Sequence, residues 1–222
     1  MDSALVDVVR RHWEHLAGPG ARFAPVEEAR ALVAPGSVVF PAGWCGIVTI
    51  AGRVLATAPD ADGARVLDDH LRGGRPSPPA VLGPARLAYL ARDVPLPTVP
   101  GELHPTDPGD ALQNLLRGCS ADDVGESGMT GIDSPAFLVV EDGETLAAAG
   151  YELWPNDVAH LCVLVRAGAR GRHLARTVAA RASAHAQSAG LLCQWRARPA
   201  DSLRVARSLG YEVLGNQLGL RW

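Results

Sequence analysis

A helix with an almost purely alanine face, set between two apolar segments, restricts the fold of this chain more than any other feature. The helix is expected over residues 170–189, and Gly190 follows it as a typical C-terminal cap. Residues 158–165 and 191–195 on either side are apolar runs typical of buried strands. The stripe along the helix comprises Leu174, Val178, Ala182, Ala186 and Ala189. Because small side chains let a helix lie very close to a sheet, this segment predicts a parallel strand-helix-strand crossover.

Antiparallel strands and further helices are expected around the crossover. An Asp-Gly turn at Asp142 and Gly143 separates two apolar runs, and a Pro-Asn-Asp turn beginning at Pro155 leads into the strand at 158–165. The remaining expected elements are helices near 110–116, 121–127 and 199–209, strands at 136–140 and 145–154, and one or two closing strands within 211–222. The expected fold class is therefore α+β, with a mixed, mostly antiparallel sheet.

The first 105 residues are expected to form a small α/β region of their own. Residues 94–108 are the expected linker, because nine of the 17 prolines lie between residues 75 and 108 and proline disrupts regular helices. The predicted domains are thus 1–105 and 106–222. The expected elements of the N-terminal region are a helix at 4–16, an antiparallel meander of strands at 37–40, 46–50 and 54–57, a helix at 61–71 and a strand at 85–91.

Composition excludes several classes of protein. The net charge is −3, yet residues 166–207 hold nine arginines against one acid, which is typical of a segment that binds a polyanion. Nucleic acid is not the expected ligand, because the whole chain is acidic and aromatic residues do not interleave the arginines. No run of 18 apolar residues predicts a membrane span, and the N-terminus lacks signal-peptide character, so a cytoplasmic location without membrane contact is expected. The four cysteines are widely spaced and are expected to be buried thiols, with no metal site.

The stretch from Val163 to Ala175 has the character of an anion-binding segment. The apolar strand that includes Val163, Leu164 and Val165 leads through a glycine-containing turn into the long helix. The first turn of a helix leaves backbone N–H groups without partners, and the helix dipole favours anions there. Gly171 would let the backbone approach phosphate oxygens closely, and Arg170 and Arg172 would add positive charge.

This segment and the residues after it resemble the GNAT N-acetyltransferase superfamily. The resemblance covers about residues 110–222 and rests on two motifs, the turn beginning Arg170-Gly171-Arg172-His173-Leu174-Ala175 and the later Leu209-Gly210-Tyr211. It implies that coenzyme A is bound, with its pyrophosphate on the N–H groups from Gly171 to Ala175. It also implies that the pantetheine lies along Val163 to Val165, and that an N–H near Val163 polarises the thioester carbonyl.

Four positions depart from the pattern of the superfamily. Compared with its usual residues, His173 replaces a second glycine, Ala167 a frequent proline and Pro199 a frequent asparagine. Ala206 stands where many members carry a tyrosine that protonates the leaving thiolate. Water or another side chain could protonate the thiolate instead, because a coenzyme A thiol is only moderately basic.

Residues for the acceptor side are suggested by position along the strands and helices. His160 lies on the strand before the turn, and an imidazole titrates near neutral pH, so it is the candidate general base. Asp157 and Glu152 are rival bases, although Asp157 also fits a turn. Candidate acceptor-binding residues are Glu126, on the second short helix, and Trp154, with Trp195 as a further possible border of the pocket.

The sequence supports two hypotheses for the function. The first is an N-acyltransferase that transfers acetyl from acetyl-CoA to a primary amine of a small molecule or peptide, by direct attack in a ternary complex. The alternative is a non-catalytic acyl-CoA-binding regulatory module. Residues 1–105 carry no chemical signature and are compatible with a pseudo-duplicated copy of the fold, a lid over the acceptor site or an element for forming a homodimer.

Overall fold

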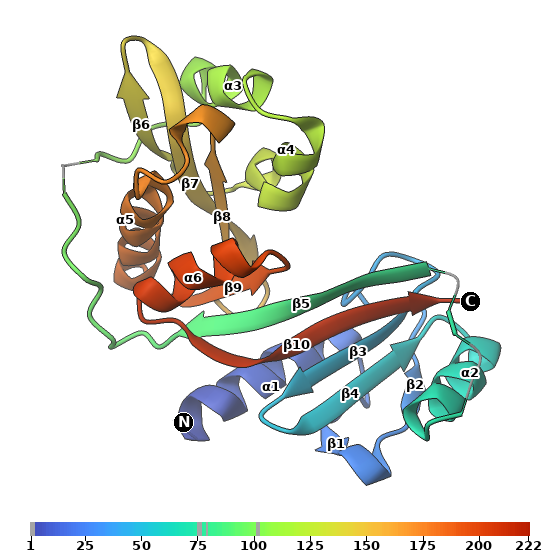
Figure 1. Cartoon of the computed structure of the whole chain (residues 1–222). Helices are drawn as coiled ribbons and strands as arrows, with labels where there is room; N and C mark the ends of the chain where they lie inside the picture. Colours follow the sequence, from blue (N-terminus) through green and yellow to red (C-terminus); the bar gives the residue numbers. More distant parts are fainter. Residues whose placement is uncertain (1–2, 75–76, 79, 101–102) are drawn as a thin grey trace. The chain divides into compact units, whose positions relative to one another are not determined.

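The computed structural model describes residues 3–74, 77–78, 80–100 and 103–222 (Figure 1). The chain forms two compact units, one from the residues up to Leu87 together with Val213–Trp222, and the other from Ala88–Glu212. It passes between the units inside strand β5 (Ala80–Leu90) and near the start of strand β10 (Glu212–Arg221). The predicted domain boundary after residue 105 stays a prediction. The last ten residues group with the N-terminal segment because β10 pairs with β3 (Cys45–Ile50).

The N-terminal unit is a twisted sheet with two helices. Its strand order is β1-β4-β3-β10-β5, with β2 beside β4, and every pair whose register is described is antiparallel except the parallel pair of β2 and β4. The elements that complete it are α1 (Ser3–Ala17), β1 (Ala24–Pro25), η1 (Val26–Glu28), β2 (Ala31–Val33), β4 (Arg53–Ala58) and α2 (Ala61–Leu71). The helices predicted at 4–16 and 61–71 are confirmed.

The strand predicted at residues 37–40 is wrong. These residues are not part of the sheet, and the third strand of this region is β2 instead. The apolar character of the segment has another cause, because the ring of Phe40 lies directly over Gly46 and Gly219. These two glycines face each other in the register of β3 and β10, so they leave a hollow that the aromatic ring fills.

The C-terminal unit contains the predicted parallel crossover. Its strand order is β9-β8-β7-β6; β8 and β9 are parallel, and the other two pairs are antiparallel. Its elements are α3 (Asp110–Arg117), α4 (Ala121–Ser127), η2 (Met129–Gly131), β6 (Phe137–Glu141), β7 (Glu144–Trp154), β8 (Val158–Val165), η3 (Ala167–Ala169), α5 (Leu174–Ser188), β9 (Leu192–Ala197) and α6 (Ala200–Ser208). The α+β fold class with a mostly antiparallel sheet is therefore confirmed.

Helices cover both faces of the C-terminal sheet. In Figure 1, α5 lies on one side of the strands, and α3 and α4 lie on the other. Cys162 and Leu164 of β8 pack with Leu112 and Leu115 of α3 on the second side. On the first side, Ala179, Ala182 and Ala186 of α5 are fully buried, as the alanine stripe requires. The small side chains bring α5 close to the sheet and fix the start of this helix beside the end of β8.

Among the described residues, none of the helices has the length and apolar character needed to cross a bilayer.

The alanine stripe leads to a test of packing. Replacing Ala182 by Leu adds three carbons where the side chain is fully buried, so we expect the free energy of unfolding to fall by about 1–3 kcal/mol. Ala184 is exposed on the same helix, and Ala184→Leu should change stability by less than about 0.5 kcal/mol. Urea denaturation of both variants measures the difference. Equal effects of the two substitutions would contradict close packing of α5 on the sheet.

Candidate functional site

Strands β8 and β9 separate part-way along their length. Their parallel pairing comprises three residue pairs, and the last is His160 with Gln194. Beyond this point β8 continues to Val165, still paired with β7 up to Ala147, whereas β9 continues to Ala197 without a register partner in β8. The last five residues of β8 therefore have a neighbouring strand on one side only, within the part of the chain that the structure describes.

Alternate residues of β8 direct their backbone N–H and C=O groups into the gap between β8 and β9. The N–H of Arg166, just after β8, donates to Leu146 O at 2.9 Å, on the β7 side. The N–H of Leu192 donates to Asp157 O at 2.8 Å, on the β9 side. Since backbone groups alternate in direction along a strand, the even-numbered residues of β8 point their N–H and C=O groups to β7 and the odd-numbered residues point theirs to the gap. Val163 and Val165 thus present hydrogen-bonding groups that β9 does not reach.

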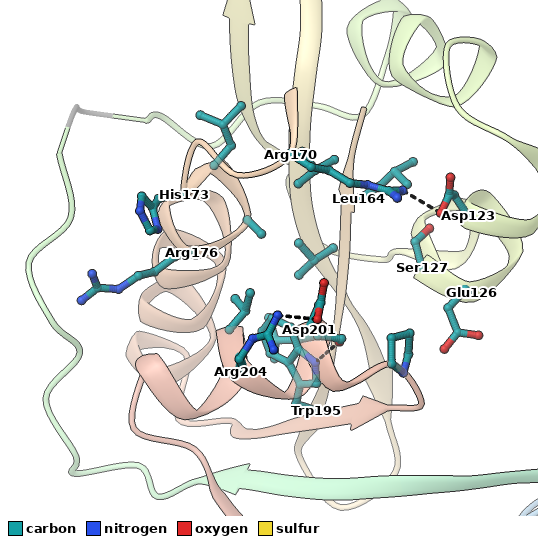
Figure 2. Close-up of a pocket in the computed structure, with 18 of the residues that line it drawn as sticks. Asp123, Glu126, Ser127, Leu164, Arg170, His173, Arg176, Trp195, Asp201 and Arg204 are labelled. Atoms are coloured by element: carbon teal, nitrogen blue, oxygen red, sulfur yellow. Dashed lines mark hydrogen bonds and ion pairs between the residues drawn. The ribbon is translucent and has the colours of Figure 1, made fainter. Parts of the chain in front are cut away.

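A cavity of about 700 Å³ occupies this gap (Figure 2). Its walls come from β8, the loop after β8, the first turn of α5, the end of β9, α6 and α4. The residues proposed for the donor that line it are Val163, Leu164, Val165, Arg170, Gly171, His173, Leu174 and Ala175. Arg172 does not line it, because its guanidinium pairs with Glu141 of β6 at 2.6 Å. The structure therefore gathers eight of the nine predicted donor residues around one cavity.

The turn into α5 differs from the predicted helix start. Helix α5 begins at Leu174, four residues later than predicted, because Gly171 (φ 80°) and His173 (φ 62°) have left-handed backbone conformations that a helix excludes. The first helical hydrogen bond runs from Thr177 N to His173 O at 3.2 Å. Among the described residues, none accepts a hydrogen bond from the six N–H groups between Gly171 and Arg176.

The backbone conformation of His173 explains how a histidine can replace the usual second glycine of the turn. A left-handed conformation suits glycine, and His173 adopts it at the position where the superfamily usually has its second glycine. Histidine is one of the residues that tolerate this conformation better than most. The substitution thus keeps the course of the backbone and adds an imidazole at the rim of the cavity.

Arginine–carboxylate pairs border the cavity. Arg170 reaches across from the loop to Asp123 of α4 at 2.7 Å, as Figure 2 shows. The hydrogen bond from the Ser120 hydroxyl, followed by the one from Arg170, holds the pKa of the Asp123 carboxyl below its ordinary value. Glu126 is likewise paired, with Arg198 just beyond β9. Asp123 and Glu126, the two carboxylates of α4 that line the cavity, are thus each paired with an arginine from the opposite wall.

His160 lies beside the cavity rather than in its lining. It is buried, and its Nδ1 is 3.1 Å from Gln194 Oε1. The ring of Trp154 stacks on the imidazole with centroids 4.5 Å apart, so Trp154 also lies outside the lining. Gln194 Nε2 donates to Tyr89 Oη at 3.0 Å, and Gln194 Oε1 faces His160. The predicted roles of His160 and Trp154 stay predictions, whereas Glu126 and Trp195 do line the cavity.

The two rival bases occupy different surroundings. Asp157 has φ 57° in the turn between β7 and β8 and lies outside the lining, which fits its reading as a turn residue. Glu152 stands opposite His160 in the register of β7 and β8. Glu152 thus remains near the candidate base, on the neighbouring strand.

Helix α6 contributes hydroxyl groups that the sequence interpretation missed. Ala206, at the position of the missing tyrosine, is fully buried and does not reach the cavity. Ser202 and Ser208 line it, and Ser202 Oγ accepts a hydrogen bond from Trp195 Nε1 at 2.9 Å. Accepting this bond leaves the Ser202 hydroxyl proton available as a donor. Nothing in the sequence motif distinguished these serines from ordinary surface residues of a helix.

Two of the cysteine thiols near the sheet, those of Cys162 and Cys193, are buried. Burial raises the pKa of Cys162 and of Cys193 to about 12, so both stay protonated near neutral pH. Neither lines the cavity, and a covalent acyl-cysteine intermediate therefore has no candidate there. Within the described residues, no group of three or more histidine, cysteine or acidic side chains is arranged to hold a metal ion.

Comparison with solved structures identifies the fold. A GCN5-related N-acetyltransferase-like protein from Streptococcus suis 89/1591 matches with a TM-score of 0.52 and 16% identity over 98% of each chain. An acetyltransferase of the GNAT family from Colwellia psychrerythraea matches with a TM-score of 0.50 and 13% identity over 66% of this chain and 58% of its own. This chain has the GNAT fold. No family sequence model matches it, and no curated protein matches its sequence.

The two solved structures match different shares of this chain. The GNAT-fold structure from Streptococcus suis covers nearly the whole chain, so its likeness includes the N-terminal unit as well as the cavity-bearing unit. The Colwellia structure is longer, and this chain spans only 58% of it. At these identities the likeness concerns the fold, and the chemistry has to be argued from the residues of the GNAT-like cavity itself.

Alkylation of the cysteines tests whether Cys162 and Cys193 are buried beside the cavity. At pH 8 we expect an alkylating reagent to label Cys119, which is partly exposed, while Cys162 and Cys193 react only after unfolding. Peptide mass spectrometry locates the label, and Cys119→Ser should remove the fast reaction. Labelling of Cys162 as fast as Cys119 would contradict its burial.

The same thiols determine a pH dependence of stability. The pKa values of both thiols are raised from 9.0 to about 12 in the folded protein. Below pH 9 both thiols are protonated in the folded and in the unfolded chain, so their ionisation does not lower the free energy of unfolding there. Between pH 9 and 12 the unfolded chain loses these protons and the folded chain keeps them, which lowers stability as the pH rises. Denaturation of the wild type and of Cys193→Ala across this range should show a shallower decline for the variant.

Proposed function

We propose that this protein is an N-acyltransferase that transfers an acetyl group from acetyl-CoA to a primary amine. The observation that carries the proposal is the gap between β8 and β9 beyond His160 and Gln194. Within the part of the chain that the structure describes, the gap presents a strand edge without a partner strand and leads to a helix start whose N–H groups lack acceptors. Both border a single cavity. A ligand that is peptide-like at one end and anionic at the other fits this combination.

The diphosphate of the donor fits the turn between β8 and α5. The N–H groups from Gly171 to Arg176 lack acceptors among the described residues, and the positive end of the α5 dipole lies at the same place. Gly171 has open space where a side chain would begin, so the backbone can be approached closely. Arg170 would add charge to the site by exchanging its bond with Asp123 for one with a phosphate.

The pantetheine arm fits the edge of β8. Its two amide groups can form hydrogen bonds with the N–H and C=O groups of Val163 and Val165, as an added strand would. The cavity volume of about 700 Å³ is within the range of small-molecule sites. The arm would then bring the thioester to the narrow end of the gap, near His160 and Gln194.

Direct transfer is the mechanism that these residues support. The nitrogen of an uncharged amine attacks the thioester carbonyl carbon, the C–S bond breaks, and the nitrogen loses a proton while the thiolate gains one. The N–H of Val163 is directed into the gap and can stabilise the negative charge that develops on the carbonyl oxygen. The absence of a cysteine from the lining residues supports a single direct step over a covalent enzyme intermediate.

His160 is the proposed proton acceptor, acting from beside the cavity. Because Gln194 Oε1 accepts from Nδ1–H, the neutral imidazole carries its lone pair on Nε2. A proton from the amine would reach it directly or through water. Ser202, whose hydroxyl proton is available, can donate a hydrogen bond to the leaving thiolate, and water supplies the proton that the missing tyrosine would have given.

Donor binding is tested by calorimetry with acetyl-CoA. A bulky side chain at Gly171 would occupy the space near the diphosphate, so Gly171→Leu should weaken binding at least about tenfold. Gly168 has equally open surroundings but does not line the cavity, and Gly168→Leu should bind like the wild type. Circular dichroism verifies that both variants fold. Equal affinity of the two variants would count against this donor site.

Transfer is tested by turnover with a panel of primary amines. We expect one class of amine to yield N-acetylated product, at a rate that rises with pH as the attacking amine loses its proton. Product should be followed by mass spectrometry, because the partly exposed Cys119 would react with thiol reagents. Tight acetyl-CoA binding with no product from any amine would instead support the non-catalytic binding module.

A further inference from the structure

The arginines that line the cavity differ in whether they already have an anionic partner. Arg170 and Arg204 are paired with carboxylates of the cavity wall, the latter with Asp201 at 2.5 Å. Within the described residues, Arg176 and Arg196 make neither an ion pair nor a side-chain hydrogen bond. Figure 2 shows that Arg176 points away from the other labelled side chains of the pocket. Arg196 therefore remains as a cavity-lining arginine for which the described residues provide no anionic partner.

Arg196 lies at the point where β9 leaves β8. It comes two residues after Gln194, the last residue paired with β8, so its side chain lies on the same face of the sheet as that of Gln194. Arg198, two residues further, lies on this face too and pairs with Glu126 of α4. Arg196 therefore stands on the α4 side of the sheet, between the Gln194–His160 pair and the Arg198–Glu126 pair.

This position is separate from the proposed diphosphate site. In the register of β8 and β9, Arg196 would stand opposite residue 162, three residues or roughly 10 Å before the end of β8. The diphosphate site lies beyond the end of β8, at the start of α5, and α5 covers the other face of the sheet (Figure 1). The phosphates of the donor would thus be bound without using Arg196.

An aromatic platform orders the guanidinium. Arg196 Cζ lies over the ring of Trp154, 6.0 Å from its centroid, and Trp154 is in turn stacked on His160. A guanidinium above an aromatic ring can still direct the N–H groups at its edge to a ligand, and these groups form a planar fork. Such a fork matches a carboxylate in a bidentate geometry.

Among the described residues, no carboxylate forms an ion pair with Arg196. The three carboxylates in the cavity lining, Asp123, Glu126 and Asp201, are each paired with another arginine. Glu126 and Glu152 act on Arg196 as nearby negative charges, but within the part of the chain that the structure describes neither forms an ion pair with it. Arg196 is exposed and lines the cavity, so its guanidinium is open to an incoming anion.

We propose that Arg196 binds a carboxylate of the acceptor, so that the acylated amine belongs to an amino-acid-like molecule. This inference rests on the proposed function and identifies its substrate class. The carboxylate would be held on the Arg196–Trp154 platform, next to His160, and the amine of the same molecule would point into the gap toward the thioester. Arg196 is thus a residue that determines specificity rather than one that takes part in the chemical step.

Binding of product analogues tests this inference without depending on turnover. Calorimetry should compare N-acetyl amino acids with the corresponding N-acetyl amino-acid amides, using side chains of several sizes, on the protein saturated with coenzyme A and on the protein alone. We expect at least one acid to bind about 10- to 100-fold more tightly than its amide, as is typical of hydrogen bonds to a charged group. In Arg196→Gln the acid and the amide should bind alike.

Arg207→Gln is the matched control, because Arg207 is exposed on α6 and does not line the cavity. It should keep the full preference for the acid. Three results would overturn the inference: no preference for acids in the wild type, the same preference in Arg196→Gln, or tighter binding of a phosphorylated amine than of any acid. Failure of the proposed function looks different, since coenzyme A would then not bind or no amine would be acetylated, whatever the acids and amides do.

Discussion

The hydrogen bonds between β8 and β9 end at His160 and Gln194, and the chemistry available to this protein depends on that early end. A strand edge inside a protein normally pairs with another strand, since unpaired backbone groups cost free energy. Here β8 continues to Val165 with its odd-numbered residues directed at a cavity instead of at β9. The energetic cost of the open edge is explained if a ligand with its own amide groups completes the pairing.

The alanine stripe of α5 positions the start of this helix beside the open edge of β8. Because Ala179, Ala182 and Ala186 are fully buried, the helix lies close to the sheet and its first turn is held beside the end of β8. The left-handed residues Gly171 and His173 then turn the chain sharply, which exposes the N–H groups at the start of the helix. The open edge of β8 and the turn at the start of α5 are thereby placed along one cavity, which Arg196 also lines. The proposed donor would use the edge and the turn, and the proposed acceptor carboxylate would use Arg196.

Local signals in the sequence were sufficient for most elements of the C-terminal unit and for eight residues that the structure places around one cavity. Strand β8 and helix α2 have the predicted bounds, because strong turn residues flank them. The start of α5 was misplaced because a histidine gives no sign of a left-handed conformation. Phe40 suggested a strand, although its ring fills a hollow between two glycines that only the pairing of β3 and β10 brings together. Arg196 lacks an ion-pair partner among the described residues, whereas Arg170, Arg198 and Arg204 each pair with a carboxylate of the cavity wall. Sequence spacing does not predict which arginine pairs with which carboxylate.

Amide hydrogen exchange followed by NMR, with and without acetyl-CoA, tests the central claim most directly. Leu164 N–H is bonded to β7 in either state and serves as an internal reference. We expect the amides of Val163 and Val165, and those from Gly171 to Arg176, to exchange more slowly when acetyl-CoA is bound. Unchanged exchange at these amides under saturating acetyl-CoA would contradict the claim that the open edge of β8 and the start of α5 bind the donor.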